Sequence, residues 1–175
     1  LLTADNQNKA DVALSKAREW FDTQKMQMLI GGTNSAAALG LAKLAQDRKR
    51  IFFVNGSGSS ALTNEQCSPY TVHYAWDSVA FAKGAAAALT QQGSKDWFIL
   101  TADYAFGHAL EADAAKVVKA NGGRAVGSVR HPLNTLDFSS FLLQAQTAKA
   151  QVLGLSNAGG DTTNAVKAAR EFGLD

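Results

Sequence analysis

Short apolar runs alternate with longer helical segments along almost the whole chain, and this alternation is the feature that most constrains the fold. The expected strands are residues 28–30, 51–54, 97–102, 124–129 and 151–155. Apolar residues at helical spacing predict helices at 7–24, 35–47, 77–92, 106–121, 137–149 and 161–172. Strands joined by helices of this length form parallel sheets with right-handed crossovers. We therefore predict an α/β fold, with helices on both faces of its sheets because the apolar runs are continuous.

Short polar side chains mark where the helices begin. Ser35 is expected to cap the helix at 35–47, and Asp77 and Asp137 are expected to cap two later helices. Asp161 has the same expected role in the last helix. The reason is that hydroxyl and carboxylate oxygens accept hydrogen bonds from the free N–H groups of a first helical turn.

The stretch 61–76, "ALTNEQCSPYTVHYAW", has no regular apolar pattern and lies between two halves that each repeat the order strand, polar loop, helix. It is therefore the expected boundary between lobes. We predict a first lobe at 1–74 and a second lobe at 75–175.

Composition excludes several classes of protein. The formal net charge is +2 without a block of like charges, and a basic face interleaved with aromatic residues is missing, which argues against nucleic-acid binding. The sequence has no run of about 18 apolar residues, so we expect no membrane span. Cys67 is the single cysteine, which excludes an internal disulfide. The chain begins inside a strand-and-helix pattern, so we expect it to be a piece of a longer protein.

Polar loops follow four of the predicted strands, and ligands bind beyond the carboxyl ends of parallel strands. The first loop, "GGTNS", places Thr33, Asn34 and Ser35 at a helix N-terminus, where N–H groups and hydroxyls bind an anion or a carboxylate well. The second loop, "NGSGSS", adds the hydroxyls of Ser57 and Ser59. These residues also have plain structural interpretations, as turn and capping residues.

The two later loops offer different chemistry. "TADYAFG" contributes Tyr104 and Phe106, which are flat surfaces for an organic ligand, and "SNAGGD" contributes the amide of Asn157. Taken alone, Phe106 would more simply be a core residue at a helix start. The functional interpretation depends on all four loops lying at the same ends of their strands.

No catalytic or metal-binding motif accompanies these loops. "GSGSSA" lacks the third glycine of a dinucleotide fingerprint, and neither a phosphate-binding P-loop nor a nucleophile elbow occurs. His73, His108 and His131 lie far apart without metal-ligand spacing, and we interpret them as surface or hinge residues. Asp103 follows a strand, but no nucleophile motif accompanies it. We therefore predict no catalytic residue, no metal and no cofactor.

From "TADYAFGHAL" through "DFSSFLLQAQ" to "GLSNAGG", with "IGGTNSAAAL" and "LTNEQCSPYTVHYAWDS" upstream, the chain resembles the leucine/isoleucine/valine-binding family. These are type I periplasmic binding proteins, the extracellular solute receptors of ABC transporters. The resemblance implies two Rossmann-like lobes with parallel sheets that close on a small ligand, deliver it to a membrane permease and catalyse nothing. It also implies a periplasmic or extracellular location. The chain looks like a fragment, without the family's first strand-helix unit and its later part.

The resemblance assigns roles to individual residues. The loop with Thr33, Asn34 and Ser35 is expected to hold the ligand's carboxylate, and the loop with Ser57 and Ser59 is expected to add contacts. Phe106 matches a position that packs on the ligand from the second lobe, and Asn157 falls near another such position. Many amino-acid members have a cysteine near position 34, which this chain lacks. An aromatic or other organic acid is therefore as plausible a ligand as a branched-chain amino acid.

Three further expectations complete the sequence interpretation. The first sheet would lack a central strand, so its exposed edge could pair with a second copy of the chain. A nucleotide-dependent enzyme of the Rossmann type is an alternative function, although Asn55 stands where such an enzyme needs an acidic residue. The ligand-sensing domain of a regulator is the other alternative, since it shares the two-lobed fold.

Overall fold

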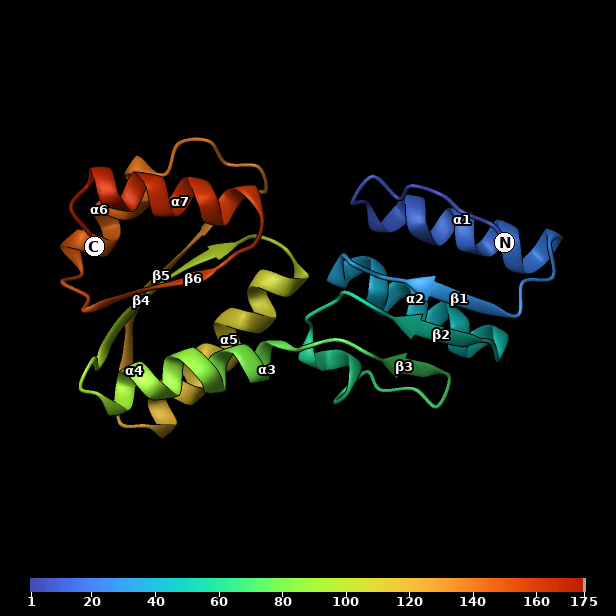
Figure 1. Ribbon diagram of the computed structural model, residues 1–175, viewed down its shortest axis with the longest axis horizontal. Helices are drawn as coiled ribbons and strands as arrows, with labels where there is room; N and C mark the ends of the chain where they lie inside the picture. The colour runs from blue at the N-terminus through green and yellow to red at the C-terminus, as the bar shows by residue number, and fades with distance from the viewer. Residues whose placement is uncertain (175) are drawn as a thin grey trace. The chain divides into compact units, whose positions relative to one another are not determined.

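The computed structural model describes residues 1–174, and these form two compact units, Leu1–Asp77 and the part of the chain from Ser78 onward. Figure 1 shows the elements of each unit. Both units alternate strands and helices, and every strand pair is parallel. The predicted α/β fold with parallel sheets is confirmed. No helix among residues 1–174 combines the length and the apolar character that a membrane crossing requires.

The first unit contains a three-stranded sheet in the order β1-β2-β3. Its elements are α1 (Ala10–Thr23), β1 (Met28–Gly31), α2 (Ser35–Arg48), β2 (Ile51–Val54), the short 3-10 helix η1 (Ser60–Leu62) and β3 (Thr71–His73). The strand β3 lies inside the stretch that we expected to be irregular. It is only three residues long and pairs with β2 on one side, which is too short for a periodic pattern to reveal.

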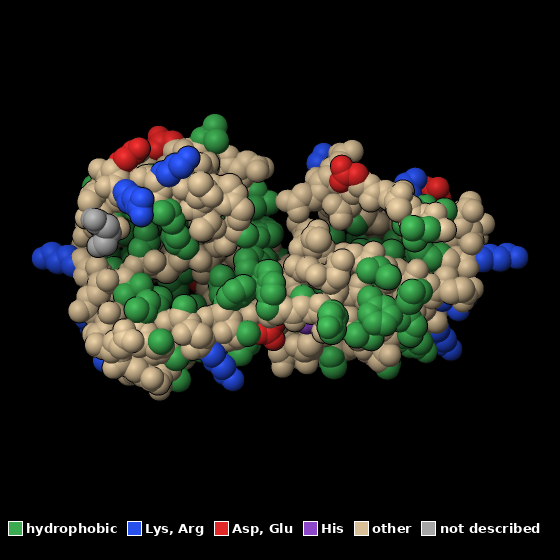
Figure 2. Space-filling model, in the orientation of Figure 1, with side chains coloured by type: hydrophobic (Ala, Val, Ile, Leu, Met, Phe, Trp, Pro, Cys, Tyr) green, Lys and Arg blue, Asp and Glu red, His purple; other side chains and the backbone are tan. Residues whose placement is uncertain are grey.

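Helices α1 and α2 cover one face of the first sheet. Leu29, Phe52 and Val54 are buried against them in one apolar cluster. The alternate strand residues Met28 and Ile30 are 48% and 60% exposed. The prediction that both faces would be covered is therefore wrong for this unit within the described chain, and Figure 2 shows hydrophobic side chains gathered on its viewed face.

The second unit is built around a longer central strand, in the order β5-β4-β6. Its elements are α3 (Ser78–Phe81), a π-helical segment η2 (Ala82–Ala87), α4 (Ala88–Gln91), β4 (Asp96–Ala102), α5 (Ala105–Ala120), β5 (Arg124–His131), α6 (Ser139–Thr147), β6 (Val152–Ser156) and α7 (Gly160–Glu171). The helix predicted at 77–92 is therefore interrupted by a π segment. This segment, "AKGAAA", contains Gly84, whose low helix propensity was a weak signal of an irregularity, but it contains no proline that would have marked an interruption.

Helices cover both faces of β4. Leu100 packs with Phe138 and Leu142, while Trp97 packs with Ala86 and Val118 on the opposite face. Figure 1 shows α6 and α7 on one side of this sheet and α5 on the other. The continuous apolar run of β4 is the pattern expected for a strand buried on both faces.

Three of the four expected caps stand at other positions in the structure. Asn34, not Ser35, is the N-cap of α2, because its side-chain oxygen accepts the Ala37 N–H at 3.1 Å. Asp161 lies one residue inside α7, whose N-cap is Gly159. In α2 and α7 the helix already includes the residue that was expected to cap it, whereas α6 begins one residue later than a cap at Asp137 would place it. Asp137 does accept a first-turn N–H, although Phe138 stands at the cap position of α6.

Candidate ligand-binding site

In the first unit, the loops after β1 and β2 lie against each other. Gly31 pairs with Val54 in the sheet, and the Asn55 N–H donates to the Gly31 carbonyl at 3.1 Å. Gly32 has a φ of +81°, and a Cβ there would lie 2.9 Å from the ring of Phe52. A glycine is needed at this position both for the backbone conformation and for the close approach. The two small polar loops therefore form one surface at the carboxyl edge of the sheet.

The N-terminus of α2 is held in place by Asn34. Its amide oxygen caps the helix, and its amide nitrogen donates to Asn8 Oδ1 at 2.9 Å. The amide oxygen and the amide nitrogen of Asn34 are therefore both hydrogen-bonded within the protein. Among residues 1–174, the backbone N–H groups of Ser35 and Ala36 have no acceptor. They are the donors that the 14-residue helix presents, with its positive dipole end, at this edge.

Three buried serines belong to the same two loops as these N–H groups. Ser35, Ser57 and Ser59 are each at most 2% exposed. Ser57 Oγ accepts the Ser59 N–H at 3.4 Å and donates to Ser35 Oγ at 2.9 Å. The hydroxyl hydrogen of Ser35 consequently stays available as a donor. His73 Nε2 donates to the Ser57 carbonyl at 2.6 Å and fixes the loop from β3.

The second unit brings a different set of side chains to the carboxyl edge of its sheet. Gly107 allows α5 to start directly beside β4, because a Cβ there would lie 2.1 Å from the Ala102 carbonyl oxygen. Tyr104 and Phe106, on this turn, have ring centroids 5.9 Å apart. Phe106 is 6% exposed, while Tyr104 is partly buried.

A carboxylate lies near the tyrosine. Burial, and to a smaller extent the negative charge of Asp161, raises the pKa of the Tyr104 hydroxyl above its ordinary value. The phenol is therefore protonated at neutral pH and can donate a hydrogen bond. Asp161 is itself 6% exposed and accepts the Asn134 N–H at 3.2 Å, which ties the loop after β5 to the start of α7.

Asn157, after β6, belongs to a buried polar chain. Its Nδ2 lies 3.3 Å from His131 Nε2, and its Oδ1 accepts from the Thr162 hydroxyl at 2.8 Å. His131 is fully buried, so its interpretation as a surface or hinge residue is wrong. The strand β5 runs two residues beyond its predicted end and carries His131 into the unit. Sequence reasoning missed the roles of His131 and Thr162; the available signal was the position of His131 two residues after the expected end of the strand at 124–129.

The structure thus gathers the predicted residues into two groups. The first group, in the first unit, is Thr33, Asn34, Ser35, Ser57 and Ser59, and the second, in the second unit, is Tyr104, Phe106 and Asn157. Thr33 is the exposed member of the first group. His108 and Asp103 both have exposed side chains, and His108 Nε2 lies 2.7 Å from Asp103 Oδ1.

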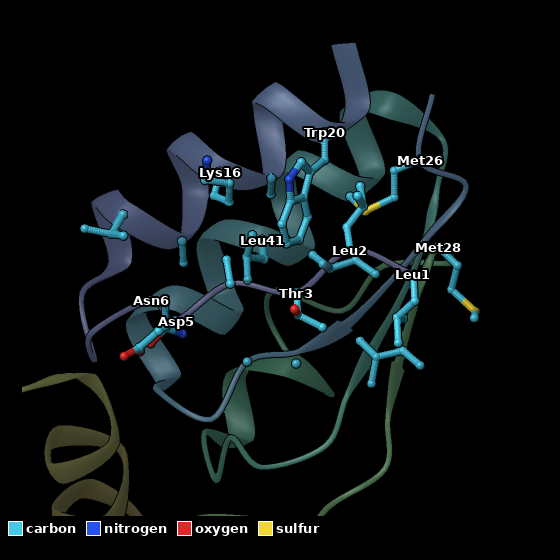
Figure 3. A pocket seen from close by; sticks show the side chains of 18 residues that line it. Leu1, Leu2, Thr3, Asp5, Asn6, Lys16, Trp20, Met26, Met28 and Leu41 are labelled. Atoms are coloured by element: carbon cyan, nitrogen blue, oxygen red, sulfur yellow. The ribbon is translucent and has the colours of Figure 1, made fainter. Parts of the chain in front are cut away.

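A separate hollow of about 540 Å³ lies in the first unit, between the N-terminal segment, α1 and β1. Figure 3 shows Leu1, Leu2, Trp20, Met26 and Met28 around it. Its lining is mainly apolar and includes no member of the first group. A carboxylate needs hydrogen-bond donors, so the serine loops fit a small acid better than this hollow does.

The chain belongs to the periplasmic binding protein family, because the family model with that description matches residues 1–175. Among solved structures, a periplasmic binding protein from Burkholderia mallei is 62% identical, with a TM-score of 0.95 over 98% of this chain and 46% of that chain. A branched-chain amino acid ABC transporter periplasmic ligand-binding protein from Burkholderia xenovorans LB400 is 37% identical, with a TM-score of 0.77 over 98% and 46%.

A third solved structure carries a ligand in its description. It is the solute binding protein of an ABC transporter from Rhodopseudomonas palustris BisB5 in complex with 3,4-dihydroxybenzoic acid, at 28% identity and a TM-score of 0.87 over 99% and 47%. This chain spans less than half the length of these three proteins. No curated protein matches the chain. The predicted family of solute receptors is confirmed.

Proposed function

We propose that this chain is a ligand-binding portion of a periplasmic solute receptor that serves an ABC transporter. The receptor binds a small organic acid and delivers it to a membrane permease, and it turns over no substrate. The observation that carries the proposal is the pair of buried hydroxyls, Ser35 and Ser57, behind the free N–H groups of α2. Hydroxyl donors and the positive end of a helix favour an anionic acceptor, and a carboxylate is the anion that a small organic acid offers.

The second unit supports an organic rather than a purely inorganic ligand. Tyr104 and Phe106 offer aromatic side chains after β4, and Asn157 offers an amide after β6. One relative is described with 3,4-dihydroxybenzoic acid and another by branched-chain amino acids. We propose that an aromatic acid is the preferred ligand and that a branched-chain amino acid is the second candidate.

We further propose that the free edge of β1 pairs with a second copy of the chain. Within residues 1–174, the only strand beside β1 is β2, so one row of its backbone groups is unpaired. Sedimentation at increasing concentration tests this association. A monomer over the whole range, up to the millimolar level, would contradict it.

Calorimetric titration tests the ligand proposal. We expect the protein to bind at least one of benzoate, 4-hydroxybenzoate, 3,4-dihydroxybenzoate and L-leucine. Ser35→Ala should weaken the tightest of them by about tenfold or more, since a hydrogen bond to a charged group contributes about 1.5–3 kcal/mol.

Ser139→Ala is the matched control. Ser139 is the first residue of α6, as Ser35 is the first residue of α2, but it is exposed and belongs to neither group of site residues. Its replacement should leave every affinity unchanged. Equal affinities of the parent protein and Ser35→Ala would contradict the carboxylate site, and tightest binding of an uncharged analogue such as benzamide would contradict the ligand class.

A further inference from the structure

The buried imidazole of His131 occupies a closely defined place in the second unit. It is fully buried at the end of β5, and its ring meets Phe138 edge-on with centroids 4.9 Å apart. Phe141 approaches it at 6.1 Å. The ring is therefore held by aromatic contacts, and each ring nitrogen faces one polar group of the protein.

The partner of one ring nitrogen fixes the proton on the other. His131 Nδ1 lies 2.8 Å from the carbonyl oxygen of Pro132. A carbonyl oxygen can only accept, so Nδ1 carries the proton. In a neutral imidazole, Nε2 is then an acceptor, and it requires a donor 3.3 Å away at Asn157.

The same argument fixes the amide of Asn157. Only its Nδ2 can donate to His131, so its Oδ1 must face Thr162, whose hydroxyl donates at 2.8 Å. A single backbone carbonyl, at Pro132, thus determines the direction of three consecutive hydrogen bonds. One Nδ2–H of Asn157 is not used by this chain of bonds.

We propose that His131 is a positioning residue that holds Asn157 with this second N–H directed to the ligand. The group of the ligand that meets Asn157 is therefore a hydrogen-bond acceptor, such as a carboxylate or hydroxyl oxygen, and not an ammonium group. This inference rests on the proposed function, in which Asn157 contacts the ligand. It adds the chemical character of the ligand atom that meets Asn157.

Nitrogen-15 NMR tests the first half of the proposal without any ligand. Long-range proton–nitrogen spectra at pH 8, above the ordinary titration range of histidine, distinguish the two neutral tautomers. We expect the Nδ1–H tautomer for His131, with His131→Gln identifying its signals. The Nε2–H tautomer would overturn the proposal, because Nε2 would then donate to Asn157 and reverse its amide.

Binding of benzoate and of L-leucine tests the second half. His131→Met removes the acceptor and should weaken the tighter probe by about tenfold, the loss expected for one misdirected hydrogen bond. His131→Gln can place an amide oxygen near the position of Nε2, and it should stay within about threefold of the parent protein. Circular dichroism and thermal unfolding show that each variant is folded.

A double-mutant cycle separates positioning from general support of the fold. In an Asn157→Ala background, His131→Met should cause no further loss of affinity. A full additional loss there, or equal losses for His131→Gln and His131→Met, would overturn the positioning role. If none of benzoate, 4-hydroxybenzoate, 3,4-dihydroxybenzoate and L-leucine binds to the parent protein, the proposed function is contradicted, while the tautomer spectra still decide the direction of the three hydrogen bonds.

Discussion

The two units use the same pattern of three parallel strands but bury them differently. In the second unit, the central strand β4 is seven residues long, and six of its residues are buried. In the first unit, the strands are four residues or shorter, and β1 has two of its four residues exposed. The second sheet is covered by helices on both faces, and the first sheet on one face.

The two sheets have regular strand pairing in common and differ in how much apolar surface the helices bury. Residues in β4 gain apolar burial on both sides, at about 25 cal/mol per Å². Alternate residues in β1 and β2 gain little, although their pairing registers are regular. We therefore expect the second unit to be the more sensitive to changes in its strands.

The largest expected effect is a core truncation in β4. Leu100→Ala should lower the free energy of unfolding by about 2–5 kcal/mol, since Leu100 is 1% exposed among Phe138 and Leu142. The matched change Ile30→Ala in β1 should cost within about 0.5 kcal/mol, because Ile30 is 60% exposed. Urea unfolding followed by circular dichroism measures both. Equal losses in the free energy of unfolding would contradict the difference between the two sheets, and they would indicate that something covers β1 in solution.

An intermediate effect is expected at the cap of α2. Asn34→Ala should cost about 1 kcal/mol, with a range of about 0.5–2, because the Ala37 N–H loses its acceptor. Asn34→Ser keeps a capping oxygen but loses the bond to Asn8, so thermal unfolding of the two variants separates these contributions. If the serine variant is as unstable as the alanine variant, the contact with Asn8 is the more important one.

The smallest effect is a pH dependence in the second unit. Hydrogen bonding from Ser139 lowers the pKa of Asp137 below its ordinary value. A carboxyl whose pKa is lowered by folding stabilises the folded state above its unfolded pKa of about 3.9, and this contribution is lost as the pH falls through the folded pKa. The melting temperature of Asp137→Asn should therefore be lower than that of the parent protein at pH 6, and the gap should narrow as the pH falls below the unfolded pKa.

A constant gap between pH 6 and pH 3 would contradict the assignment of this pH dependence to Asp137. In the same unit, the hydrogen bond from Arg124 lowers the pKa of Asp96, so both proteins should lose some stability in the same acidic range. The measured quantity is therefore the difference between the two melting temperatures and not either temperature alone.

The sequence was most informative where one physical rule decides the structure. Continuous apolar runs such as residues 97–102 predicted buried strands, and closing glycines predicted helix ends. The serine loops were predicted correctly as neighbours because parallel strands end at one edge. The bare face of the first sheet could not be predicted, since Met28 and Ile30 are apolar whether or not something covers them.

The hydrogen-bond partners of the candidate site's side chains also could not be predicted from the sequence. In the sequence, Asn34 and Asn157 are both amides that follow a strand. In the structure, Asn34 caps a helix and bonds Asn8, whereas Asn157 contacts a histidine and a threonine. The difference depends on partners that are distant in sequence, namely Asn8 and His131. Spacing along the chain carries no information about such contacts until the fold brings them together.

The close approach at Gly107 has a practical consequence for any redesign of the turn between β4 and α5. A side chain of any size at this position would collide with the Ala102 carbonyl, so the turn between β4 and α5 tolerates only glycine there. Tyr104, on the same turn, is only partly buried, whereas Phe106 is 6% exposed. A library that varies position 104 while keeping Phe106 and Gly107 would therefore test the proposed ligand contact of Tyr104 with little change to the packed turn.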